Sequence, residues 1–388
     1  MKLSRRLSRG TRGYLVAVAY VFFFVAASEH TDAHKPVTSK YDYNKDIFPL
    51  LRDHCGSCHV PGGPAPMSLM TYNDAVPWAE SIRDELTAGR MPPWPVDPTS
   101  PPIRGGRAIS PRDLDMIVVW ASGGTPEGTE AKPAAVTFQS QWQLGPPDLT
   151  ISMEAEHTLA PGTLEETRDF SLSTRVTDTK WVSAADLMPG TSSIVRDAVI
   201  SIETGPVLAL WEPGSNTTPA PAGAAFRLDP GSKIHVQIHY KKHFDQEQNA
   251  VSDRSTVGLY FTVPPPSGRE LQSFAIDSPQ STGGSVASTT FTGSLPEGAR
   301  IVALRPMLDR AYESLSIDAI APSGTDLPLL RLRGPRPQWV QRYWLQEPVE
   351  LAKGSKIIVS VTPLSDYSDE PKGNKHSPLE VAVDYVPL

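Results

Sequence analysis

Proline is the sequence feature that most constrains this fold. The chain has 39 prolines in 388 residues, about twice the usual share of roughly 5 %. Because proline interrupts helices and the central strands of sheets, such a chain favours short strands, turns and irregular loops over long helices. Hydrophobic residues make up 39 % of the chain, which is enough apolar surface to exclude wholesale disorder. The length suggests two or three domains.

Helix signals are confined to residues 41–128. Asn44 and Asn73 are candidate N-caps of two short helices. Ser110 precedes a proline and a row of apolar residues at helical spacing, which is typical of a helix start, and Gly123 is placed to end that helix. Three short helices joined by long proline-rich loops predict a small all-α domain.

The hydrophobic period changes from about residue 148 onward. Runs such as 234–240 and 356–361 alternate β-branched and polar residues and are bounded by turn residues. No helical pattern of comparable quality follows Trp120. Residues 148–388 are therefore expected to form antiparallel β-sheet, as one large sandwich or two of ordinary size.

Residues 1–28 are typical of a secretory signal peptide. Five positive residues and no acidic one precede an apolar run from Tyr14 to Ala27, and small residues follow. The run is shorter than the roughly 20 residues that span a membrane, so an uncleaved anchor is the minority alternative. We expect a periplasmic or otherwise exported protein that contacts a membrane only through an uncleaved signal. A net charge of -7 argues against nucleic acid as a partner.

The only two cysteines lie in the pentapeptide Cys55-Gly56-Ser57-Cys58-His59. The pattern C-x-x-C-H is the attachment signature of c-type haem. Two thiols at this spacing can each add to one vinyl group of the porphyrin, and the adjacent histidine becomes an axial ligand of the iron. The pentapeptide predicts covalent haem c on Cys55 and Cys58, with His59 as the proximal ligand.

Two other uses of this pentapeptide fit less well. A zinc site would need further ligands at finger-like spacing, and the chain has no second cysteine pair. A thioredoxin-like redox pair would need a βαβ setting, whereas this pair follows an expected helix.

Methionine is the common second axial ligand of electron-transfer haems. Met67 and Met70 lie too close to the proximal histidine in sequence to reach the other face of the haem comfortably. Met91 follows a helix and is held by Pro92-Pro93, which makes it the preferred distal ligand. Core packing is the usual fate of a methionine and stays open as the alternative. His54 is a weaker candidate.

Several strings resemble known families. The haem pentapeptide together with residues 46–49, 64–69, 89–94 and 120–124 resembles a bacterial monohaem cytochrome c domain, a type often fused to a copper type II monooxygenase module. The remaining chain resembles the peptidylglycine α-hydroxylating and dopamine β-monooxygenases, which implies two jelly-roll sandwiches; this similarity lies in residues 211–214, 231–240, 253–261 and 348–355.

The resemblance implies a fold class and a domain order. The expected fold is a small all-α cytochrome c domain followed by an all-β double jelly-roll sandwich. The expected parts are a signal peptide (1–28), the cytochrome c domain (29–128), a linker (129–147) and monooxygenase-like N-terminal and C-terminal sandwiches (148–265 and 266–388).

The copper ligands of that family are mostly replaced in this chain. The resemblance implies a first site with a His-His pair near residues 194–195 and the histidine of a Q-x-H-Y strand, which survives as His239. The pair itself is absent, and Arg196-Asp197 stands next to its place. The second site implies His-x-His and a methionine, but Met307-Leu308-Asp309 stands there. Copper prefers imidazole and thioether ligands, so copper binding is not expected.

Three histidines on one strand do not restore a metal site. His235, His239 and His243 are four residues apart, and positions i and i+4 of a strand are separated by about 13 Å. Solvated or partly buried imidazoles are therefore expected. A site formed by Asp197, His239 and Asp309 stays open, although Arg196 would place a positive charge beside it.

The sequence thus predicts an exported monohaem electron-transfer protein whose monooxygenase-like β module has lost copper and serves docking or structure. Its expected partner is a redox protein, such as a copper monooxygenase homologue or another exported oxidoreductase. Two alternatives stay open. One is an active copper-dependent monooxygenase with unconventional ligands that receives electrons from the haem. The other is a structural subunit of an exported redox complex.

Overall fold

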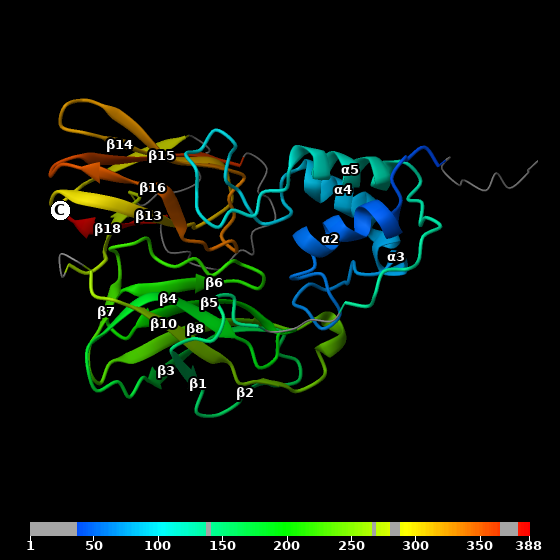
Figure 1. Ribbon diagram of the computed structural model, residues 1–388, viewed down its shortest axis with the longest axis horizontal. Coiled ribbons are helices and arrows are strands. Elements are labelled where there is room, and N and C mark those ends of the chain that lie inside the picture. Colours follow the sequence, from blue (N-terminus) through cyan, green and yellow to red (C-terminus); the bar gives the residue numbers. More distant parts are fainter. Residues whose placement is uncertain (1–36, 137–140, 266–268, 280–287, 365–378) are drawn as a thin grey trace, which may run out of the picture.

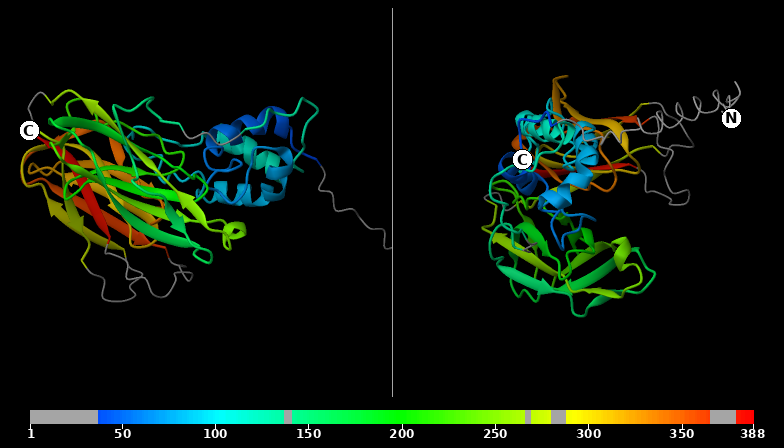
Figure 2. Two further views of the ribbon diagram at one scale, coloured as in Figure 1. Left: turned by 90° about the horizontal axis from the view of Figure 1, so that it is seen from below. Right: turned by 90° about the vertical axis from the view of Figure 1, so that its right-hand side faces the viewer.

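The computed structural model describes residues 37–136, 141–265, 269–279, 288–364 and 379–388. The predicted signal peptide (1–28) and part of the predicted linker lie outside these ranges. Within them, a group of short helices lies at one end of two β-sandwiches (Figure 1), and a view from below shows the same arrangement (Figure 2). No helix in the described ranges is long and apolar enough to cross a membrane.

The expected fold class, a small all-α cytochrome c domain followed by an all-β double jelly roll, is wrong for this chain. The described residues are mostly β-sheet, with 18 strands in a jelly-roll-like arrangement, and the longest helix has 12 residues. The reason is the proline-rich segment 92–110, which cannot continue a helix. It runs along the second sandwich instead, where Val96 and Ile103 form isolated bridges with Leu332 and Leu345. No substantial all-α domain is therefore present among the described residues.

The helices are short and begin at residues that cap them. The Ser110 hydroxyl accepts a hydrogen bond from the backbone of Asp113, which confirms this predicted helix start. The caps predicted at Asn44 and Asn73 are wrong, because Asp42 and Thr71 lie two residues earlier and accept these hydrogen bonds instead. The helices are η1 (Tyr43–Ile47), α2 (Phe48–His54), α3 (Tyr72–Ala75), η2 (Val76–Trp78), α4 (Ala79–Thr87) and α5 (Pro111–Ser122).

These helices share a small core of their own. Tyr43, Leu51, Ile117 and Trp120 are fully buried in it. The hydroxyl of Tyr43 donates a hydrogen bond of 2.8 Å to the carbonyl of Leu69. This bond fixes the loop after α2, which carries the C-x-x-C-H pentapeptide, against the first helical turn.

The first sandwich consists of two four-stranded antiparallel sheets and a two-stranded ribbon. One sheet has the order β1 (Leu149–Ser152), β10 (Thr256–Thr262), β4 (Lys180–Met188) and β7 (Phe226–Leu228); the other has the order β3 (Glu165–Ser173), β8 (Lys233–Lys241), β5 (Val195–Ile202) and β6 (Val207–Trp211); the ribbon pairs β2 (His157–Leu159) with β9 (Val251–Asp253). A three-residue helix, η3 (Phe244–Gln246), follows β8.

Strand β8 confirms the strand predicted at residues 234–240. Ile234, Val236 and Ile238 point into the core, while His235 and His239 lie on the opposite, polar face. Side-chain alternation therefore places both histidines on the face of the sheet that turns away from the sandwich core.

The second sandwich also consists of two four-stranded antiparallel sheets. Its β17 confirms the strand predicted at residues 356–361. One sheet has the order β11 (Gln272–Asp277), β18 (Glu380–Pro387), β13 (Ala299–Met307) and β16 (Tyr343–Leu351); the other has the order β12 (Thr289–Ser294), β17 (Lys356–Pro363), β14 (Tyr312–Ile320) and β15 (Asp326–Arg333).

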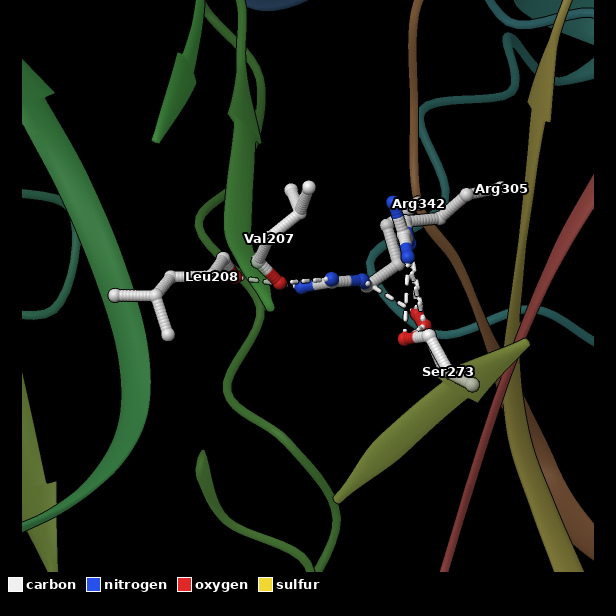
Figure 3. A network of polar contacts seen from close by, with 6 residues as sticks. Val207, Leu208, Ser273, Arg305 and Arg342 are labelled. Carbon is white, nitrogen blue, oxygen red and sulfur yellow. Dashed lines mark hydrogen bonds and ion pairs between the residues drawn. The ribbon is translucent and has the colours of Figure 1, made fainter. Parts of the chain in front are cut away.

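A buried charge cluster joins the two sandwiches (Figure 3). Asp384 on β18 is fully buried and accepts hydrogen bonds from Arg305 on β13 and from Arg342, which precedes β16. Arg342 also donates to the carbonyls of Val207 and Leu208 on β6 of the first sandwich. Every charged group of the cluster thus has a partner, and Arg342 spans the junction.

Candidate functional site

The C-x-x-C-H pentapeptide forms a tight turn at the end of α2. The backbone N–H of Cys55 donates to Leu51, and that of His59 donates to the carbonyl of Cys55 at 2.8 Å. A Cβ atom on Gly56 would lie 2.5 Å from the carbonyl oxygen of Arg52, so only glycine fits there. The turn brings both thiols and the imidazole together, and both cysteines are free thiols.

The imidazole of His59 is oriented by a backbone carbonyl. Its Nδ1 lies 3.2 Å from the carbonyl oxygen of Met67. Burial lowers the pKa of His59 and favours the neutral ring. When Nδ1–H donates to this carbonyl, Nε2 carries the free lone pair, which is the arrangement of a metal-ligating histidine.

The candidate distal ligands have different surroundings. Met70 is buried in the helical core and Met67 packs against that core. Met91 follows α4, is 40 % exposed and is not part of the helical core. The described contacts do not join Met91 to His59, so its role as distal ligand stays a prediction. His54 faces Asp113 on α5 at 3.6 Å.

Loops of the first sandwich cover the pentapeptide. The Sγ atom of Cys58 lies 3.4 Å from the carbonyl oxygen of Pro213. Gly214 has a φ of +70°, and a Cβ atom there would lie 2.2 Å from the hydroxyl of Ser57. The Nε2 atom of His243 lies 3.0 Å from the carbonyl oxygen of Pro64. Local sequence patterns did not reveal this packing; the one available signal was the turn glycine in residues 211–214.

A buried ion pair lies behind that turn. Arg107 donates to the carbonyl of Gly214 at 2.9 Å, and its Nη2 lies 3.5 Å from a carboxylate oxygen of Glu212. Gln341 from the second sandwich donates to the same carboxylate at 3.2 Å. Burial raises the pKa of Glu212 to about 7 against the opposing charge of Arg107. The turn that touches Cys58 therefore carries a carboxyl group that is partly protonated near neutral pH.

The surviving Q-x-H-Y histidine has carboxylates on both sides. Nδ1 of His239 lies 2.7 Å from Asp197, and Nε2 lies 2.8 Å from Glu165. Burial opposes charging of the ring, but the two carboxylates outweigh it and raise the pKa of His239. Both ring nitrogens are thus hydrogen-bonded, and neither points at a free space for a metal ion.

The other residues of the proposed residual metal site are not drawn to His239. The carboxylate of Asp309 accepts from the hydroxyl of Tyr312 at 2.6 Å. His235 faces a carboxylate of its own, Asp169, at 3.1 Å. No group of three or more histidine, cysteine, aspartate or glutamate residues within the described ranges is placed to hold a metal ion.

Comparisons with known proteins do not assign the chain to a family. No family model matches it, and no curated protein matches it. Among solved structures it is similar to the major capsid protein P2 from bacteriophage PM2 (9 % identity, TM-score 0.28, 61 % of this chain and 96 % of that one), allantoicase (8 %, 0.20, 58 % and 78 %) and the PBSX exported protein XepA (9 %, 0.18, 75 % and 99 %). Likenesses this weak carry no argument about function.

Proposed function

We propose that this chain is an exported, monohaem c-type electron-transfer protein. Cys55 and Cys58 hold haem c covalently, His59 is the proximal axial ligand and Met91 the distal one. The observation that carries the proposal is the donor set of one tight turn: two free thiols and an imidazole whose Nδ1 lies on the Met67 carbonyl. When bound, haem iron supplies one-electron chemistry at a potential that its axial ligands set.

The residues of this chain would position and tune that group. The Met67 carbonyl fixes the ring of His59 with Nε2 free, so that the ring is oriented before any ligand binds. The α2 turn fixes the separation of the two thiols. The thioether of Met91 would favour reduced iron and raise the potential.

The β module is proposed to act in docking or structure, without copper. His239 supports this view because both of its ring nitrogens are hydrogen-bonded to carboxylates. The expected partner is a copper monooxygenase homologue or another exported oxidoreductase, which would exchange electrons with the haem. The domain limits at residues 128, 147 and 265 belong to the same proposal.

The test is a pyridine haemochrome spectrum together with iron and copper analysis of the full chain, produced in a host that attaches haem c. We expect about one iron per chain, no copper and a c-type spectrum that survives acid-acetone extraction. The double variant Cys55→Ser/Cys58→Ser should lose the covalent haem. A chain without covalent haem would refute the proposal, and about one or two copper ions with ascorbate-driven oxygen uptake would instead indicate an active monooxygenase.

The distal ligand is tested separately in the haem-loaded protein. Replacement of the thioether in Met91→His should lower the reduction potential, because imidazole favours reduced iron less than a thioether does. Met67→Leu is the matched control and should leave the potential nearly unchanged. An unchanged potential in Met91→His would exclude Met91 as the ligand.

A further inference from the structure

A small cavity lies where the proline-rich segment passes between the two sandwiches. Its volume is about 70 Å³. Water occupies about 30 Å³ per molecule in the liquid, so the cavity accommodates about two waters or an organic molecule of three or four heavy atoms. It is lined by residues of all three parts of the chain, including Trp94, Arg104, Arg107, Trp211, Arg342 and Trp344.

The wall of this cavity is rich in positive charge. Of its three arginines, Arg104 donates to the carbonyl of Pro219 at 2.9 Å, and Arg342 is held by Asp384 and the carbonyls of β6 (Figure 3). Arg107 uses Nη1 to reach Gly214, but its buried Nη2 has no hydrogen-bond acceptor among the described residues. A buried guanidinium N–H without an acceptor is costly, and an anion would remove that cost.

The ion pair with Glu212 does not satisfy Arg107. The 3.5 Å separation is an electrostatic contact and not a hydrogen bond. One oxygen of Glu212 is itself buried and without a donor among the described residues. Burial also favours the protonated form of this carboxyl group, which weakens it further as a counter-ion.

We propose that this cavity binds a small carboxylate of the size of formate or acetate, with an oxygen accepting a hydrogen bond from Nη2 of Arg107. The faces of Trp94, Trp211 and Trp344 enclose the apolar end of such a ligand. Carboxylate is preferred over water because three guanidinium groups surround the cavity and a charge-assisted bond is stronger than a neutral one. The inference does not depend on haem binding.

The test uses sodium acetate labelled with ¹³C and the full chain, at constant ionic strength, with line broadening of the acetate signal as the readout. A four-atom ligand is limited to a dissociation constant of about 0.05 mM or weaker. Arg107→Gln should weaken saturable binding at least about tenfold. The matched control is Arg227→Gln, which removes the same charge from a half-exposed arginine on β7 that is paired with Asp229; it should bind as the wild type does.

A second variant tests the cavity itself without changing any charge. Ala209 lines the cavity, and Ala209→Met should fill it and abolish saturable binding. This variant keeps the proposal testable if Arg107→Gln does not fold. Absence of saturable binding to the wild type would mean that the cavity holds only water. Equal binding by Arg107→Gln, or equal weakening by Arg227→Gln, would also overturn the proposal.

Discussion

Two buried carboxylates near the junction of the sandwiches have opposite surroundings. Asp384 accepts hydrogen bonds from two arginines and from Ser273. Burial alone would raise the pKa of Asp384, but Arg342 and Arg305 hold it below its ordinary value. Glu212 has one arginine at 3.5 Å, one hydrogen bond from Gln341 and one oxygen without a donor among the described residues. Burial therefore dominates at Glu212 and raises its pKa.

The difference separates a structural cluster from a site with unused capacity. A buried charge is tolerated when its hydrogen bonds are complete, and removal of one partner is then strongly destabilising. An incomplete cluster contributes less to stability and retains donors and acceptors for a ligand. The cluster around Asp384 belongs to the first kind, and the pair of Glu212 with Arg107 belongs to the second.

The largest expected effect comes from breaking the complete cluster. Asp384→Asn leaves Arg305 and Arg342 buried without a counter-charge, and we expect the free energy of unfolding to fall by about 3–5 kcal/mol. Urea denaturation followed by circular dichroism measures this. Asp178→Asn, which breaks an exposed pair with Lys180, is the control and should cost less than about 1 kcal/mol. A loss of similar size in both variants would contradict the comparison.

The next effect is a pH dependence of opposite sign at the two carboxylates. The pKa of Glu212 rises from an ordinary 4.5 to about 7 on folding. Its contribution to stability is therefore complete below pH 4.5 and is lost as the pH rises to about 7, by about 3 kcal/mol. Urea denaturation between pH 4.5 and 8 should show that Glu212→Gln gains stability over the wild type as the pH rises.

Asp384 provides the contrast in the same measurement. Its pKa is lowered on folding, so its contribution is present above its ordinary pKa of 3.8 and is lost as the pH falls through the lower, folded value. The deficit of Asp384→Asn should therefore shrink only in acid, well below pH 4. A Glu212→Gln variant whose stability runs parallel to that of the wild type would show that Glu212 titrates normally.

The smallest expected effect compares the two arginines. Arg342→Met removes hydrogen bonds to Asp384, Val207 and Leu208, and we expect a loss of about 2–4 kcal/mol. Arg107→Met removes one hydrogen bond to Gly214 and leaves a carboxyl group that protonates readily, so about 1 kcal/mol is expected. Denaturant midpoints of the two variants give the ranking. An equal or reversed ranking would contradict it.

Local patterns predicted the elements that local physics determines. The alternation in residues 234–240 and the cap at Ser110 were both correct, because side-chain period and capping depend only on near neighbours. The caps at Asn44 and Asn73 were wrong by two residues, since several polar side chains compete for the same backbone donors. The all-α domain was wrong, because a proline-rich loop carries no sign of the sheet along which it will run.

The candidate site divides in the same way. The pentapeptide at residues 55–59 was visible because its chemistry is contained in five consecutive residues. The Met67 carbonyl that orients His59 was not, since a backbone acceptor has no side-chain signature. The cover by Pro213 and the ion pair of Glu212 with Arg107 depend on packing between distant segments, which no local pattern encodes.

The contact between Cys58 and Pro213 has a consequence for the order of biosynthesis. The two residues are 155 positions apart, so the cysteine leaves the export machinery long before its cover exists. An attachment enzyme would have free access to the nascent turn, and much less once the sandwich has closed over it. Maturation is therefore expected to precede docking of the sandwich, so that haem loading and folding compete in time.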